Sequence, residues 1–112
     1  INMFSLAYPE KSSNWTNRFQ MFATQNMWTF ILLDSYNGRL WQVQYSTQDL
    51  DNLFCIPINK NELVENNERC VFSIQPLTSM YQYYLINDNT GDMWKFQWST
   101  KGDDYRWIER FR

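Results

Sequence analysis

The chain has 112 residues, of which 44% are hydrophobic and 19% aromatic, with a formal net charge of −2 and no His. One domain is expected at this length, and so high an aromatic content excludes an intrinsically disordered chain. No apolar run reaches the roughly 18 residues that a membrane-spanning helix needs, and the lack of His removes the commonest general base and metal ligand.

Eight short strands are predicted, because runs rich in Val, Ile, Tyr, Phe and Trp are separated by turn residues at the spacing typical of all-β proteins. An N-terminal arm of undefined conformation covers 1–17. Strands are expected near 18–24, 27–34, 39–46 and 53–58, then a polar connector at 59–70 with room for one helical turn, then strands near 71–76, 80–87, 92–99 and 106–111.

The two halves of the chain repeat each other. A shift of 53 residues, which brings Trp41 onto Trp94, superposes 27–47 on 80–100 without a gap. Repeat 1 then covers 18–58 and repeat 2 covers 71–111 of a single β domain. We expect two tandem four-stranded antiparallel units related by a pseudo-twofold axis, forming an eight-stranded barrel or a sandwich. The closed barrel is favoured because closure removes exposed edges.

Four-residue hairpin loops are predicted at 35–38 and 88–91, each ending in a Gly with positive φ. Asp34 and Asn87 are expected to cap these loops with their side-chain oxygens. This loop length places the bulky apolar residues of each hairpin on one face, which we expect to be the buried face of both sheets. The residues of this face are Trp28, Phe30, Leu32, Trp41, Val43 and Tyr45 in repeat 1, and Tyr81, Tyr83, Leu85, Trp94, Phe96 and Trp98 in repeat 2.

The opposite face of both sheets is predicted to face outward and to carry the binding site. Amides beside hydroxyl and aromatic groups suit a sugar, a peptide strand or a partner protein, although they also satisfy the plain alternation of a solvated strand. The candidate ligand-binding residues are Thr29, Gln42, Gln44, Gln82, Tyr84, Lys95 and Gln97. Apolar residues on the same face indicate that a partner, a connector helix or the N-terminal arm covers part of it. These are Ile31, Leu33, Leu40, Ile86 and Met93.

No catalytic sequence motif is present, so we expect a non-enzymatic protein with no metal and no cofactor. The alternative is a small hydrolase that uses paired carboxylates such as Asp51 and Asp104, although these repeat equivalents also suit a structural turn. Cys55 and Cys70 are expected to be buried free thiols, because two cysteines without His make neither a disulfide framework nor a usual zinc site.

Basic and aromatic residues alternate near the C-terminus, a pattern that suits a groove for single-stranded nucleic acid. The residues are Lys95, Lys101, Arg106, Arg110 and Arg112, interleaved with Trp94, Trp98, Tyr105 and Trp107. Acidic residues in the same stretch cancel most of the positive charge, and a strand with a basic polar face is the favoured explanation of the pattern, so a nucleic-acid partner is not expected.

The segments MWTFILLDSYNGRLWQVQYS and MYQYYLINDNTGDMWKFQWS resemble a group of small bacterial proteins of the Bacteroides type with two NMWxFxLLDxxxGRxWQVQxS units. The resemblance covers the chain from Arg18 on, and repeat 2 departs from it with Tyr81 at the Trp position and Asp92 at the Arg position. It implies a bacterial source and a duplicated β domain, and it implies no activity. A cytoplasmic location is expected, with a secreted form after signal removal as the alternative.

Together these patterns predict a non-catalytic binding or protein-interaction module with a protein or glycan partner and no membrane span. The first alternative is a carbohydrate-binding module, which requires at least one exposed, flat Trp. The second is a binder of single-stranded nucleic acid that uses the C-terminal stretch.

Overall fold

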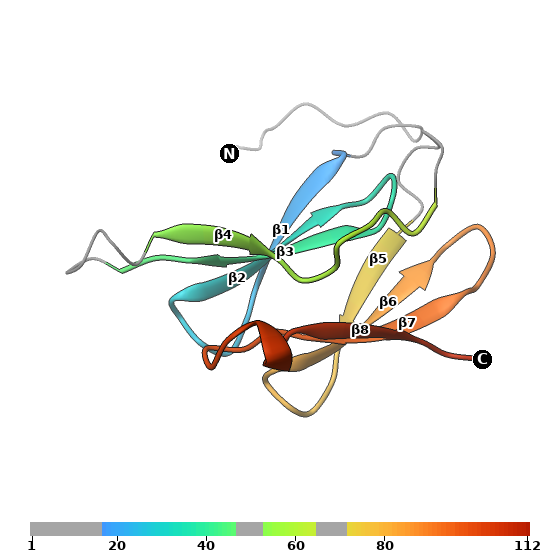
Figure 1. Ribbon diagram of the computed structural model, residues 1–112. Helices are drawn as coiled ribbons and strands as arrows, with labels where there is room; N and C mark the ends of the chain where they lie inside the picture. The colour runs from blue at the N-terminus through green and yellow to red at the C-terminus, as the bar shows by residue number, and fades with distance from the viewer. Residues whose placement is uncertain (1–16, 47–52, 65–71) are drawn as a thin grey trace.

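The computed structural model describes residues 17–46, 53–64 and 72–112. Within these residues, eight strands form two four-stranded antiparallel sheets. Sheet 1 consists of β1 (Phe19–Ala23), β2 (Thr29–Asp34), β3 (Arg39–Gln44) and β4 (Phe54–Pro57) in that order. Sheet 2 consists of β5 (Phe72–Pro76), β6 (Gln82–Asn87), β7 (Met93–Gln97) and β8 (Trp107–Arg110) in that order, with one short 3-10 helix at Asp103–Tyr105. Figure 1 shows sheet 1, in blue to green, above sheet 2, in yellow to red.

The internal duplication is confirmed by the strand ladders. Trp41 pairs with Pro57 in sheet 1, and Trp94 pairs with Arg110 in sheet 2, so the same shift of 53 residues relates both pairs. That shift carries each ladder pair of sheet 2 onto a ladder pair of sheet 1. The two repeats therefore have the same strand order and the same register.

The predicted hairpin loops are also confirmed, because the local sequence determines them. Gly38 and Gly91 have φ values of +83° and +79°, a backbone conformation that side-chain-bearing residues rarely adopt. The Oδ1 atom of Asp34 accepts a hydrogen bond from the Tyr36 N–H at 3.1 Å. Asn87 accepts one from the Asn89 N–H at 2.9 Å, so both predicted caps are present.

The two sheets do not close into a barrel, contrary to the favoured prediction. They share one hydrophobic core, but they bury opposite faces. Sheet 2 buries the predicted aromatic face, which includes Tyr83, Trp94 and Phe96. Sheet 1 buries the other face, where Ile31, Leu33 and Leu40 are fully covered. A twofold axis would bury equivalent faces, so the predicted pseudo-twofold relation is wrong, and the sheets are stacked face to back.

Packing thickness explains this arrangement. Stacked sheets lie about 10 Å apart, so a face rich in Trp, Tyr and Phe rings packs more readily against a face of smaller side chains than against a second face of rings. Ile31, Leu33 and Leu40 of sheet 1 pack in one cluster with the rings of sheet 2. The prediction that both aromatic faces are buried therefore fails for sheet 1 and holds for sheet 2 except at Tyr81, which is 41% exposed.

The connector joins the sheets at the hairpin end of sheet 1. The Leu63 N–H donates to the Asn37 carbonyl at 2.8 Å, and the Phe72 N–H donates to the Ser35 carbonyl at 3.0 Å. Residues 59–64 contain no helical turn, and 65–70 lie outside the described residues. In the described part of the chain, no helix has the length and apolarity needed to cross a membrane.

Candidate functional site

The seven predicted ligand-binding residues fall into two groups. Thr29 and Gln42 are 0% exposed, because sheet 2 covers the face of sheet 1 on which they lie. Their prediction as outward-facing binding residues is therefore wrong. Gln44 is half-buried at the margin of the same interface. The remaining four, Gln82, Tyr84, Lys95 and Gln97, lie together on the outer face of sheet 2.

Gln42 joins the two sheets. Its Oε1 atom accepts hydrogen bonds from the Ser99 N–H at 3.1 Å and from Nη1 of Arg106 at 3.3 Å. Its Nε2 atom donates to Oε1 of Gln44 at 3.2 Å. The hydroxyl of Thr29 donates to the same Gln44 oxygen at 3.4 Å. A buried amide satisfied in this way is a structural bridge, since each unpaired buried group would be costly.

The outer face of sheet 2, which we call the amide face, carries Gln82, Tyr84, Ile86, Met93, Lys95, Gln97, Trp107 and Glu109. Gln82 donates from Nε2 to Oε1 of Gln97 at 2.9 Å, and Gln97 donates to the Tyr105 carbonyl at 2.9 Å. Trp107 is the ladder partner of Gln97, so its ring lies beside these amides on the same side of the sheet.

The outer face of sheet 1, which we call the open face, carries Phe19, Met21, Phe30, Leu32, Trp41 and Val43. Phe19 is 51% exposed and Met21 is 56% exposed, and the other four are half-buried. In sheet 2, Phe72 stands at the position equivalent to Phe19 and is only 2% exposed. The open face is thus an aromatic sheet face of the kind that sheet 2 buries.

The rings of the open face keep the arrangement of their buried equivalents. The centroids of Phe19 and Trp41 lie 6.3 Å apart, and those of Phe72 and Trp94 lie 5.7 Å apart. The guanidinium of Arg39 lies over the Trp41 ring at 4.9 Å. The Nε atom of Arg39 is buried and has no hydrogen-bond partner among the described residues. The surface is therefore mainly apolar, with one cation stacked on its central indole.

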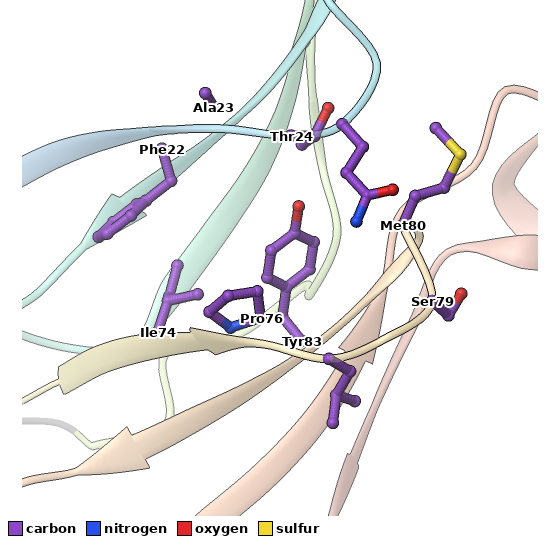
Figure 2. A pocket seen from close by; sticks show the side chains of 10 residues that line it. Phe22, Ala23, Thr24, Ile74, Pro76, Ser79, Met80 and Tyr83 are labelled. Carbon is purple, nitrogen blue, oxygen red and sulfur yellow. The ribbon is translucent and has the colours of Figure 1, made fainter.

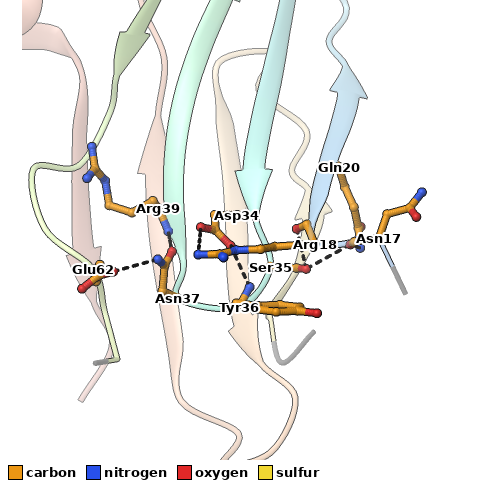
Figure 3. A network of polar contacts seen from close by, with 9 residues as sticks. All are labelled: Asn17, Arg18, Gln20, Asp34, Ser35, Tyr36, Asn37, Arg39 and Glu62. Carbon is orange, nitrogen blue, oxygen red and sulfur yellow. Dashed lines mark hydrogen bonds and ion pairs between the residues drawn. The ribbon is translucent and has the colours of Figure 1, made fainter. Parts of the chain in front are cut away.

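A polar network closes the hairpin end of this face (Figure 3). Asp34 accepts two hydrogen bonds from Arg18, at 2.9 and 3.0 Å, and the Ser35 hydroxyl donates to the Arg18 carbonyl at 2.7 Å. The hydrogen bond to Asp34 raises the pKa of Arg18. Arg18 also lies 4.9 Å above the Tyr36 ring. Asp34 is thus fully engaged as a loop cap and ion-pair partner.

A pocket of about 390 Å³ lies between β1 and β5, where the edges of the two sheets meet. Figure 2 shows Phe22 and Thr24 above it and Ile74, Pro76 and Tyr83 below and within it. Burial raises the pKa of Tyr83, which is the one titratable side chain among the residues that line the pocket. This lining offers no acid–base pair.

The groups that the sequence singled out for chemistry are not brought together. Asp104 is exposed on the 3-10 helix, and its predicted partner Asp51 lies outside the described residues. Cys55 is a free thiol but is exposed on β4, so its predicted burial is wrong, and Cys70 lies outside the described residues. Within the described ranges, no three Cys, Asp or Glu side chains are grouped so as to hold a metal ion.

The open face was missed as a candidate surface by the sequence reasoning, although a signal for it exists. Repeat 2 carries Gln75, Lys95 and Glu109 on its outer face. At the three equivalent positions, repeat 1 has Phe22, Gln42 and Ile56, none of them charged. This asymmetry indicates that the equivalent face is covered in repeat 1 and exposed in repeat 2.

Comparison of the chain with protein-family models, with curated proteins and with solved structures gave no match. No relative therefore assigns a role to a residue of either surface. The geometry of the open face and of the amide face is the basis on which a function is proposed.

Proposed function

We propose that this protein is a non-catalytic protein-interaction module, built as a two-sheet sandwich, that binds its partner through the open face. The observation that carries the proposal is the difference between Phe19, 51% exposed, and its repeat equivalent Phe72, 2% exposed. Aromatic faces of this kind are rarely left uncovered on monomeric proteins, and contiguous apolar patches mark interaction sites.

The shape of the open face favours a protein partner. Its residues come from β1, β2 and β3, so they form a broad pleated surface and not a cleft. Trp41 lies at the centre with Arg39 stacked on it. Trp and Arg are the residue types most enriched at the energetic centres of protein interfaces.

Carbohydrate binding on the amide face is the second candidate, favoured by the position of Trp107 beside Gln97. The test is titration with soluble polysaccharides, read by Trp fluorescence. Sugar stacking on Trp107 predicts a change that the Trp107→Ala variant loses. This candidate is contradicted if the variant shows the same fluorescence change as the wild type, or if the wild type shows no change.

Nucleic-acid binding by the C-terminal stretch has less support. Trp94 and Trp98 are buried, so their rings are not available for stacking with bases. Arg106 pairs with Asp103 at 2.8 Å, and Arg110 pairs with Asp92 at 3.0 Å. Two of the five basic side chains of the stretch are thus paired with carboxylates within the protein.

The proposed function is tested by affinity capture from extract of the source cells with the tagged full-length chain, quantified by mass spectrometry. Met21→Glu places a charge on the open face at an exposed position, Tyr84→Glu places one on the amide face, and Lys60→Gln is a control with the same charge change. A protein that the wild type, Tyr84→Glu and Lys60→Gln retain and Met21→Glu loses supports the proposal. Retention that depends on Tyr84 and not on Met21 contradicts it.

A further inference from the structure

We infer that the partner of the open face is a second copy of this chain, docked through its amide face. The inference rests on the proposed function and names its partner. Within one molecule, the face of sheet 1 that corresponds to the amide face already covers the face of sheet 2 that corresponds to the open face. The internal interface is therefore a template for an external one.

The receiving surface matches the template closely. Phe19 and Trp41 have the identical residues Phe72 and Trp94 at the equivalent buried positions, and Leu32 corresponds to Leu85. Met21, Phe30 and Val43 replace Ile74, Tyr83 and Phe96. Each change keeps an apolar or aromatic side chain, so the open face presents sheet 2's binding surface a second time.

The docking surface, which is the amide face, resembles the buried face of sheet 1 but carries more polar side chains. Tyr84, Ile86 and Met93 stand where Ile31, Leu33 and Leu40 are buried in the internal interface. The cross-strand amide pair Gln82–Gln97, with a hydrogen bond of 2.9 Å, replaces the pair Thr29–Gln44, with one of 3.4 Å.

The internal interface has its cation on the side of sheet 2, whereas the external interface has a cation on the docking amide face. Inside the molecule, Arg106, which directly precedes β8 of sheet 2, donates to the neutral Gln42 of sheet 1. At the external interface, Lys95 stands at the position of Gln42, and the position of Arg106 is occupied by Leu53. One cation thus remains at that place, and Arg39, stacked on Trp41 at the hairpin end of the open face, is a second cation of the same interface. Lys95 and Glu109 make the contact more polar than the internal one, as expected for reversible association.

This geometry is heterologous, since one face docks on a different face of the next copy. Each copy keeps one free open face and one free amide face, so association does not close after two molecules. Stacks of sheets that grow with protein concentration are the expected product.

Sedimentation velocity over a range of concentrations tests the inference with the full chain. The wild type and Lys60→Gln are expected to grow beyond dimers. Met21→Glu and Tyr84→Glu, each alone, are expected to weaken association about tenfold or more, because each places a charge where the interface excludes water and burying a charge is costly. An equimolar mixture of the two is expected to form a heterodimer and stop there, since one intact face remains on each variant. Circular dichroism melts identify any variant that fails to fold, for which Met21→Lys and Tyr84→Lys serve as replacements.

Several results would overturn the inference. A wild type that stays monomeric rejects the second copy as the partner. An isologous dimer that Met21→Glu disrupts and Tyr84→Glu leaves intact rejects the amide face as the surface that docks on the open face. If the capture experiment still retains another protein through Met21, the proposed function survives the loss of this inference. If nothing depends on Met21 in either experiment, both are wrong.

Discussion

The two sheets have the same ladders and the same rings, yet one aromatic face is buried and the other is not. Phe72 and Trp94 lie in the core, whereas Phe19 and Trp41 lie on the open face. The comparison shows that residue type and strand register do not decide which side of a sheet becomes interior. The element that packs against a sheet decides it. Here the two sheets pack against each other, and the faces that they bury are not equivalent.

The largest expected difference is between the two equivalent tryptophans. Trp94→Ala leaves a cavity in the core and is expected to lower the free energy of unfolding by about 3–5 kcal/mol. Trp41→Ala removes a half-buried ring and is expected to cost about 1–2 kcal/mol. Urea denaturation of both variants measures the difference. Equal losses in dilute protein would contradict the exposure of the open face.

The hairpin glycines provide a second comparison. Gly38→Ala and Gly91→Ala both force a side chain into positive φ, at a cost of about 1 kcal/mol or more. A Cβ atom at Gly38 would also lie 2.9 Å from Leu63 and 3.1 Å from the Phe72 ring, whereas nothing lies within 4 Å of one at Gly91. Gly38→Ala is therefore expected to cost about 1–3 kcal/mol more than Gly91→Ala in thermal or urea unfolding. Similar costs would contradict the close approach of the connector and β5.

Gln42 and its repeat equivalent Lys95 give a third comparison. Gln42→Ala removes the acceptor of the Ser99 N–H and of Arg106, which leaves a buried donor unpaired. We expect a loss of about 1–3 kcal/mol from this variant and of about 0.5 kcal/mol or less from Lys95→Ala. Urea unfolding midpoints check both values. A neutral Gln42→Ala would indicate that the amide bridge does not hold the sheets together.

The smallest effect is expected in thiol labelling. Partial desolvation raises the pKa of Cys55, and the thiolate is the reactive form. In a Cys70→Ser variant, the labelling rate should rise with pH through a midpoint above that of a free cysteine peptide. Ile108→Cys, made together with Cys55→Ser and Cys70→Ser, places a thiol at the equivalent position in the core cluster. It is expected to react about tenfold or more slowly, and equal rates would contradict the difference between the faces.

The sequence predicted the parts of the fold that depend on nearby residues. Strand positions, the hairpin register and the two loop glycines follow from alternation and from turn chemistry within about 20 residues of chain. The buried face of sheet 1 could not be read in this way, because both of its faces are apolar. Leu32 and Trp41 on one side compete with Leu33 and Leu40 on the other, and sheet 2 determines the outcome.

The candidate site shows the same division. Four of the seven predicted residues, Gln82, Tyr84, Lys95 and Gln97, lie on an outer face because sheet 2 follows the expected alternation. Thr29 and Gln42 do not, because a second sheet covers them. The repeats differ in charge at the positions of Gln42 and Lys95, and position-by-position comparison of the repeats would have separated the two groups.

The hydrogen bond between Gln42 and Arg106 also has a consequence for the order of folding. It joins residues 64 positions apart, whereas the ladder partners Trp41 and Pro57 lie 16 apart. Closing a long loop costs more chain entropy than closing a hairpin, so each sheet can assemble locally before the two meet. Docking of the preformed halves is then the slow step, and substitutions at Gln42 should change the unfolding rate more than the rate at which the hairpins form.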